Sequence, residues 1–223
     1  GAQTEETRAM LERPSVQLPL TLVIEVALAR LWMSFGVKPA ALIGHSMGEN
    51  AAACVAGVLT FEDAIGLVHL RGTLFDTITG GGMLSVALGA DALRPLLGDA
   101  LDLAVVNAPE LSVASGPKAA LDALAETLSA REVESTRIRI DIAAHSRMLE
   151  PILAPFEAFL RGITLRKPTI PFVSNHTGRF ITDDGLWDRT MALNVTAAFA
   201  LCRAVMPDMA KRGDGRVVNL ASN

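Results

Sequence analysis

Residues Ala40–Gly48 read AALIGHSMG, an apolar run followed by a serine between two glycines. An alanine-rich stretch of helical character, 49–58, follows directly. This order predicts a strand, a sharp turn and a helix, with Ser46 presented at the turn. Glycines flank such a serine because a side chain there would collide with neighbouring backbone. The first amides of the helix can bind an oxyanion, so the motif indicates acyl transfer through an acyl-serine rather than a plain turn.

The composition is that of a globular protein. The chain has 223 residues, of which 50% are hydrophobic, and a formal net charge of -4. With no long basic run, we expect neither nucleic acid nor an anionic membrane surface as a partner. No uninterrupted run of about 20 apolar residues is present, so we expect no membrane segment or signal peptide. Cys54 and Cys202 lie in apolar, helix-like stretches, which suits buried thiols of a cytoplasmic protein.

The hydrophobic pattern predicts an α/β core interrupted by a second unit. Before the interruption we expect helices at 20–35 and 61–78, the second capped by Thr60. Glycines 80–82 lack the residues of a phosphate-binding loop, so we interpret them as a flexible crossing at a domain boundary. The core would then comprise 1–80 and 142–185, with a helix at 148–160 and a strand at 170–175.

The hydrophobic pattern of the interrupting unit, 83–141, predicts the element order βαββαβ. Such an order is typical of a small ferredoxin-like sheet with helices on one side. We expect its strands and helices at 83–88, 90–97, 103–107, 111–115, 118–130 and 135–140.

A serine nucleophile needs a base, and the chain has four histidines. His45 adjoins the serine, where the turn should point the two side chains apart. His69 lies within a predicted helix and His176 in a loop. We expect His145 to be the base, because it lies just ahead of a helix where the chain re-enters the core.

Several short motifs occur along the chain in the order that is found in a known protein family. The chain resembles the acyltransferase domain of modular polyketide synthases from about residue 16 to about residue 183. That family is similar to the malonyl-CoA:acyl-carrier-protein transacylases of fatty acid synthesis, which implies an α/β-hydrolase-like core with an inserted ferredoxin-like subdomain. The motifs that carry the resemblance are Gly44–Glu49, Arg71-Gly72, Gly81–Val86, Val106–Pro109, Ser115–Pro117, His145-Ser146 and Val173–Gly178.

The resemblance implies a role for each matching residue. Ser46 would be the nucleophile and His145 the general base and then general acid, without an acidic third member. Arg71 would grip the free carboxylate of a malonyl-type unit, since its fork suits a carboxylate. The backbone amide of Met47 would supply half of the oxyanion hole. A backbone carbonyl near Asn175 would orient the imidazole.

The resemblance also implies the substrate pocket and the reaction. Gln17, His45, Asn175 and Ala144 would lie at the pocket with Arg71 and Met47. The acyl group would pass from an acyl-CoA to Ser46 and then to the phosphopantetheine thiol of an acyl carrier protein, possibly among neighbouring synthase domains. No metal or redox cofactor is needed. The four residues 142–145, IAAH, match neither the malonyl nor the methylmalonyl pattern of the family, although Met47 favours malonyl.

The sequence departs from the family pattern at both ends, and other functions are therefore considered. The family begins before Gly1 with a Gly-Gln-Gly segment that gives the second oxyanion donor, so a catalytically impaired truncated remnant is one alternative. Another is a serine hydrolase or thioesterase on a related fold, which would not use Arg71. The segment 186–223 is similar to part of a short-chain dehydrogenase/reductase, with Asn194 at its helix asparagine. Hydride transfer is not expected, because the chain has no tyrosine; a helix at 189–212 and a strand at 216–220 would complete or extend the core.

Overall fold

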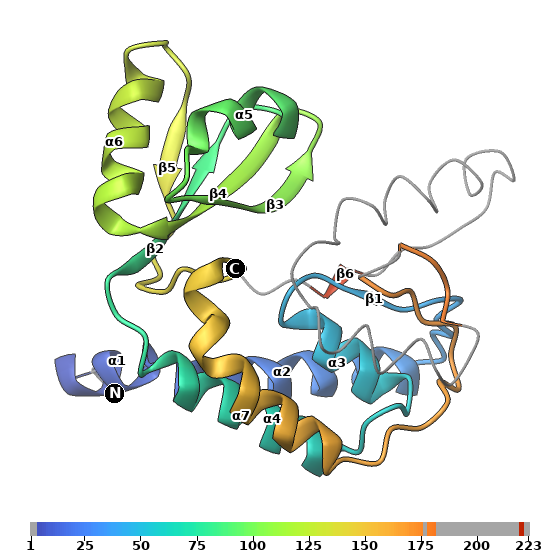
Figure 1. The fold of residues 1–223 in the computed structure, drawn as a ribbon. Coiled ribbons are helices and arrows are strands. Elements are labelled where there is room, and N and C mark those ends of the chain that lie inside the picture. The colour runs from blue at the N-terminus through green and yellow to red at the C-terminus, as the bar shows by residue number, and fades with distance from the viewer. Residues whose placement is uncertain (1–3, 176–177, 182–218, 221–223) are drawn as a thin grey trace, which may run out of the picture.

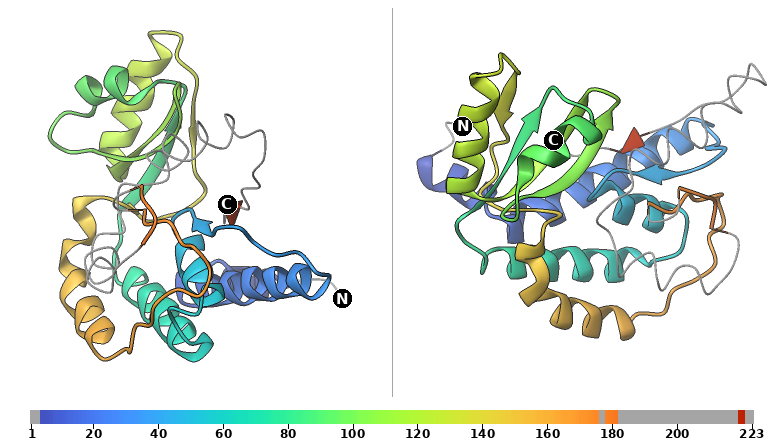
Figure 2. Two further views of the ribbon diagram at one scale, coloured as in Figure 1. Left: turned by 90° about the vertical axis from the view of Figure 1, so that its right-hand side faces the viewer. Right: turned by 45° about the horizontal axis from the view of Figure 1, so that its top comes forward.

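The computed structural model describes residues 4–175, 178–181 and 219–220. These residues form a helical core around a short parallel sheet, with a four-stranded antiparallel sheet to one side (Figure 1). Two further views also show the four-stranded sheet apart from the helices α4 and α7 of the core (Figure 2). The predicted α/β class is confirmed, with a small antiparallel sheet beside the core.

The core unit is built mainly from helices. Its two-residue strands β1 and β6 pair in parallel, with Ile43 opposite Asn219. An isolated parallel bridge joins Leu42 to Phe172 and extends this arrangement on the other side of β1. The elements are α1 (Glu5–Leu11), α2 (Pro14–Ser34), β1 (Ile43–Gly44), α3 (Gly48–Val55), α4 (Phe61–Phe75), η1 (Arg147–Leu149), α7 (Glu150–Arg161) and β6 (Asn219–Leu220).

Helix α2 is longer than predicted. It begins at Pro14 instead of residue 20, because proline at the first helical position loses no hydrogen bond. Among the described residues, α2 is the one helix long and apolar enough to cross a membrane by length and composition alone, a test that core helices also pass. It nevertheless contains Glu25 and Arg30, and its Leu22 and Val26 pack into the core with α3 and α4. We therefore describe α2 as a helix of the folded unit.

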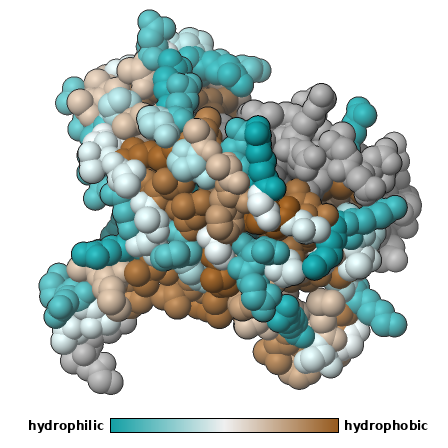
Figure 3. All heavy atoms as spheres, turned by 60° about the horizontal axis from the view of Figure 1, so that its bottom comes forward, coloured by the Kyte–Doolittle hydropathy of each residue, from teal (hydrophilic) through white to brown (hydrophobic). Residues whose placement is uncertain are grey.

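Part of the apolar surface of the core unit faces solvent. Figure 3 looks at the molecule from the side of the lower helices of Figure 1 and shows apolar side chains gathered between polar ones. The exposed apolar side chains of α2 and α7 include Leu20, Val23, Ile24, Leu28, Leu31, Trp32, Leu153 and Phe159.

The second unit has the predicted order βαββαβ. Its strands follow the spatial order β3-β4-β2-β5, and every printed pair is antiparallel. Leu84 and Val86 point to the face that α5 and α6 cover, whereas Met83 and Val113 belong to the opposite face, near Ala144. The elements are β2 (Gly81–Val86), α5 (Ala90–Leu97), β3 (Asp102–Ala108), β4 (Leu111–Pro117), α6 (Lys118–Ser129) and β5 (Ser135–Arg137). The two units have separate hydrophobic cores.

The interpretation of glycines 80–82 as a flexible crossing is wrong. Gly81 and Gly82 are the first residues of β2, and both are buried. A Cβ on Gly81 would lie 2.6 Å from the backbone nitrogen of Ala143, in the connection that leads back to the core. Residue 81 must therefore be glycine, because the two segments that connect the units pass close to each other there.

Other boundaries differ from the predictions by a few residues. Thr60 caps α4 as expected, since its Oγ1 accepts from the Asp63 amide at 3.0 Å, but α4 ends at Phe75. The predicted strand 170–175 has only isolated bridges, at Phe172 and Val173. Strand β5 ends three residues early, because the Ile140 amide turns back to the Ile138 carbonyl. The predicted helix 189–212, Cys202 and His176 lie outside the described residues.

Candidate active site

The turn between β1 and α3 is as sharp as the sequence predicts. Ser46 has a φ of 50°, in the left-handed region that a residue with a side chain rarely adopts. The Gly48 amide donates to the His45 carbonyl at 2.9 Å, and the Glu49 amide to the Ser46 carbonyl at 3.2 Å. A Cβ on Gly44 would lie 2.1 Å from the Glu49 nitrogen. The strand can therefore pass directly beneath the helix only because residue 44 is glycine.

We expect Gly44→Ala to destabilise the protein by about 3 kcal/mol or more, because neither backbone segment can yield to the new methyl group. Gly36→Ala is the control for steric contact: Gly36 has a left-handed φ of 89°, which Gly44 does not have, but a Cβ on Gly36 meets nothing within 4 Å. That control should lose only about 1 kcal/mol. Urea unfolding curves measure both values, and equal losses would contradict a steric requirement at Gly44.

Ser46 and His145 meet although 99 positions separate them. The Ser46 Oγ lies 2.9 Å from His145 Nε2, which is hydrogen-bond distance. His145 is buried and has a φ of 58°, so its backbone is also in the left-handed region. It lies on the connection from the four-stranded sheet to η1. Of the other histidines, His69 lies on α4, and its Nδ1 is 3.2 Å from the Ser15 carbonyl of α2.

A cavity of about 1080 Å³ opens at this serine–histidine pair. It lies between the two units, since residues of both contribute to its wall. The apolar face of the sheet contributes Met83, Val105, Val113 and Ile138. Of the residues expected at the site, the cavity is lined by Gln17, His45, Ser46, Met47, Arg71, Ala144 and His145.

Arg71 projects from α4 into this cavity, and it is not the solvated surface charge that an isolated helical arginine would be. Its side chain is only 8% exposed, and its guanidinium carbon lies 5.3 Å from the centre of the Phe75 ring. Burial lowers the pKa of Arg71 to about 10, and the nearby Glu49 opposes that shift. Within the described part of the chain, no carboxylate lies close enough to form an ion pair with it. A buried cation of this kind is suited to an anionic ligand.

Asn175 is placed differently from our expectation. It is buried behind the turn and does not line the cavity. Its Nδ2 donates to the Gly44 carbonyl at 2.7 Å, and its amide donates to Glu49 Oε1 at 3.2 Å. Asn175 therefore ties the segment after Phe172 to the end of β1 and the start of α3.

Glu49 was missed by our sequence reasoning. It is fully buried in the first turn of α3, and its Oε2 has no hydrogen-bond partner among the described residues. Burial raises its pKa to about 7, against the hydrogen bonds from Asn175 and the charge of Arg71, which lower it. Its position directly after the GHSMG motif was visible in the sequence, but its burial was not.

The raised pKa of Glu49 predicts a pH dependence of stability. Between its ordinary value of 4.5 and about 7, the unfolded chain releases the proton while the folded protein keeps it. The free energy of unfolding should therefore fall as pH rises through this window and level off above it. Glu49→Gln should flatten that decline in urea unfolding curves, whereas Glu126→Gln, an exposed glutamate on α6, should leave it in place. An unchanged decline in Glu49→Gln would contradict the assignment.

The amide of Met47 lies at the amino end of α3, one residue after Ser46. Among the described residues it makes no hydrogen bond. Amides at a helix start carry partial positive charge and can accept a developing oxyanion. In the same part of the chain, no group of three or more histidine, cysteine, aspartate or glutamate side chains could hold a metal ion.

Comparison with known proteins accounts for this arrangement. The family model described as acyl transferase domain matches residues 5–199. This chain belongs to the acyl transferase domain family. The match ends within the segment 186–223, whose resemblance to a dehydrogenase remains a prediction.

Relatives of this acyl transferase domain are far longer proteins. Polyketide synthase GfsA of Streptomyces halstedii is 42% identical over 193 residues, which are 83% of this chain and 3% of the relative. Mycoketide-CoA synthase of Mycobacterium tuberculosis is 43% identical over 180 residues, 79% of this chain and 4% of the relative. The chain thus spans only a few per cent of these relatives.

Solved structures match over nearly the whole acyl transferase chain. The acyltransferase domain from the second module of the salinomycin polyketide synthase is 38% identical, with a TM-score of 0.84 over 99% of this chain and 52% of that one. A malonyl CoA-acyl carrier protein transacylase from Burkholderia pseudomallei, with a TM-score of 0.86 over 99% of this chain and 79% of that one, is 24% identical and shows the shared fold.

Proposed function

We propose that this chain transfers a malonyl-type acyl group from coenzyme A to the phosphopantetheine thiol of an acyl carrier protein, through an acyl ester of Ser46. The observation that carries the proposal is the buried Arg71 in the same cavity as the hydrogen-bonded Ser46 and His145. A nucleophile with its base supports acyl transfer, and a buried guanidinium supports an acyl group with a free carboxylate.

In the first half-reaction, Ser46 Oγ attacks the thioester carbonyl while His145 Nε2 takes the hydroxyl proton. The oxyanion that forms accepts a hydrogen bond from the Met47 amide. The carbon–sulfur bond then breaks, and His145 returns the proton to the departing CoA sulfur. Ser46 is left as an ester, with His145 again neutral.

In the second half-reaction the carrier-protein thiol takes the place of CoA. His145 removes the thiol proton, the sulfur attacks the ester carbonyl, and the same amide holds the oxyanion. When the ester bond breaks, the proton passes from His145 to Ser46 Oγ. The acyl thioester leaves and the free enzyme is restored without any metal or redox cofactor.

The remaining pocket residues would set the shape of the acyl site. Gln17 comes from α2 and His45 from the turn, while Ala144 leaves room beside the base. The names of the relatives, polyketide synthases among them, support a role in polyketide or fatty acid synthesis beside neighbouring synthase domains. Such a role implies a cytoplasmic location and a carrier protein as partner.

Intact-protein mass spectrometry tests the proposal directly. The protein is incubated with malonyl-CoA or methylmalonyl-CoA, and a carrier protein bearing phosphopantetheine is then added. We expect a covalent adduct that moves to the carrier protein. An adduct that is released only to water would favour a serine hydrolase, and well-folded protein without any adduct would favour an inactive remnant.

A further inference from the structure

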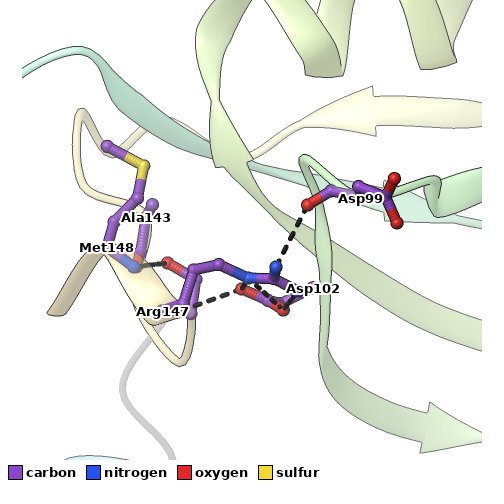
Figure 4. Close-up of polar contacts among 6 residues, drawn as sticks. Asp99, Asp102, Ala143, Arg147 and Met148 are labelled. Carbon is purple, nitrogen blue, oxygen red and sulfur yellow. Dashed lines mark hydrogen bonds and ion pairs between the residues drawn. The ribbon is translucent and has the colours of Figure 1, made fainter. Parts of the chain in front are cut away.

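Arg147 connects the segment that carries His145 to the four-stranded sheet (Figure 4). Its amide donates to Asp102 Oδ2 at 2.8 Å, and its Nη2 donates to Oδ1 at 2.7 Å. Nε reaches both carboxylate oxygens, at 3.1 and 3.2 Å, and Nη1 donates to the Asp99 carbonyl at 3.1 Å. Asp102 is the first residue of β3, 45 positions away in the chain.

Besides the bond between Ser46 and His145, Ser146 makes two local bonds within this segment. Ser146 Oγ donates to the Ala143 carbonyl at 2.7 Å and accepts from the Met148 amide at 3.3 Å. Both bonds hold the shape of the segment, because their partners lie within it. The bonds from Arg147 hold its position against the sheet, because Asp102 and Asp99 lie outside it.

His145 needs external support. Its left-handed φ of 58° is unfavourable for a residue with a side chain, and such a conformation persists only where surrounding contacts fix it. Arg147 follows it by two residues, so a shift of Arg147 would be transmitted through Ser146 to the imidazole. A shift of about 1 Å between reacting groups can lower a rate about 100-fold.

We propose that Arg147 and Asp102 form a clamp that positions His145 for proton transfer at Ser46. Neither residue lines the cavity, so they are positioning residues that act through His145. The clamp rests on the proposed function, since it assumes that Ser46 and His145 react as nucleophile and base. Both side chains are partly exposed, 57% for Arg147 and 23% for Asp102, so the pair itself should add little to stability.

The clamp can be tested in the full chain by Arg147→Ala and Asp102→Asn. One readout is the rate of Ser46 labelling by a fluorophosphonate, in which Ser46 Oγ bonds to phosphorus, fluoride leaves and His145 takes the proton. The other is acylation by malonyl-CoA. For Arg147→Ala we expect maximum rates about 10- to 100-fold lower, with unchanged half-saturating concentrations and melting temperature. Asp102→Asn keeps one acceptor oxygen and should lose less.

Arg161→Ala is the matched control. It removes a more exposed arginine–carboxylate pair, to Glu157 on α7, with the same 2.7 Å contact, and should react like the unaltered protein. Labelling of Arg147→Ala at the unaltered rate would overturn the clamp. So would a rate loss that follows a lowered melting temperature and disappears on cooling, because Arg147 would then act on stability alone.

The two readouts separate the clamp from the proposed function. Labelling needs an activated Ser46 but no acyl-CoA. Unaltered protein that labels but is not acylated contradicts malonyl transfer, and the labelling rates of the variants still decide the clamp. Unaltered protein that does not label has no activated serine, which overturns both.

Discussion

Ser46→Ala should abolish the covalent adduct with malonyl-CoA. The methyl group that replaces the hydroxyl can neither attack the thioester nor give a proton to His145, which lies 2.9 Å away in the unaltered protein. Removal of a serine nucleophile lowers turnover by about 10⁶-fold in a well-studied serine enzyme, so no adduct should be detectable within minutes or hours. Intact-protein mass spectrometry with malonyl-CoA provides the measurement.

The control for this experiment is Ser34→Ala. Ser34 is an exposed serine at the end of α2, where its hydroxyl donates to the Leu31 carbonyl. Its loss should leave the adduct intact. An adduct that persists in Ser46→Ala would place the nucleophile on another residue and refute the proposed chemistry.

Arg71→Ala should change selectivity rather than remove activity. In our proposal the guanidinium binds the free carboxylate of a malonyl-type group in a site shielded from water. Loss of one partner of a buried charge pair costs about 2–5 kcal/mol, so acylation by malonyl-CoA should fall about 30-fold or more. Acetyl-CoA has no free carboxylate, and its acylation rate should change less than about 10-fold. Rates of adduct formation with the two thioesters give the ratio.

Two further variants test whether the effect at Arg71 depends on its two-pronged donor and on its place in the cavity. Arg71→Lys keeps the charge but not the two-pronged donor, and should recover only part of the malonyl rate. Arg30→Ala removes an arginine that lies over the Phe61 ring at 5.6 Å, much as Arg71 lies over Phe75, but outside the cavity. It should leave the ratio unchanged. Equal losses for malonyl-CoA and acetyl-CoA in Arg71→Ala would contradict the role of a carboxylate receptor.

Local rules placed several elements correctly. Thr60 predicts the start of α4, because a cap depends only on a side chain and an amide three residues away. The alternation of strands and helices predicts the second unit for a similar reason, since each element must bury one face. The ends of α4 and β5 were less accurate, because turns formed by neighbouring residues stop them earlier than the apolar pattern does.

The sequence by itself determined the sharp turn that presents Ser46. Gly44, Ser46 and Gly48 are close in the chain, so the steric constraint of the turn is local. The residue types at these positions are therefore enough to predict it. His145 was selected among four histidines from its place in the order of elements.

Only the tertiary structure decided the surroundings of this pair. Burial of Arg71 and Glu49, the place of Asn175 behind the turn, and the reach of Arg147 to Asp102 all depend on segments far apart in sequence. The same holds for Gly81. Residue 81 must be glycine because Ala143 packs against it, and not because it stands in a run of glycines. Desolvation and close contact arise when distant segments pack together, and no short stretch of sequence encodes which segments those are.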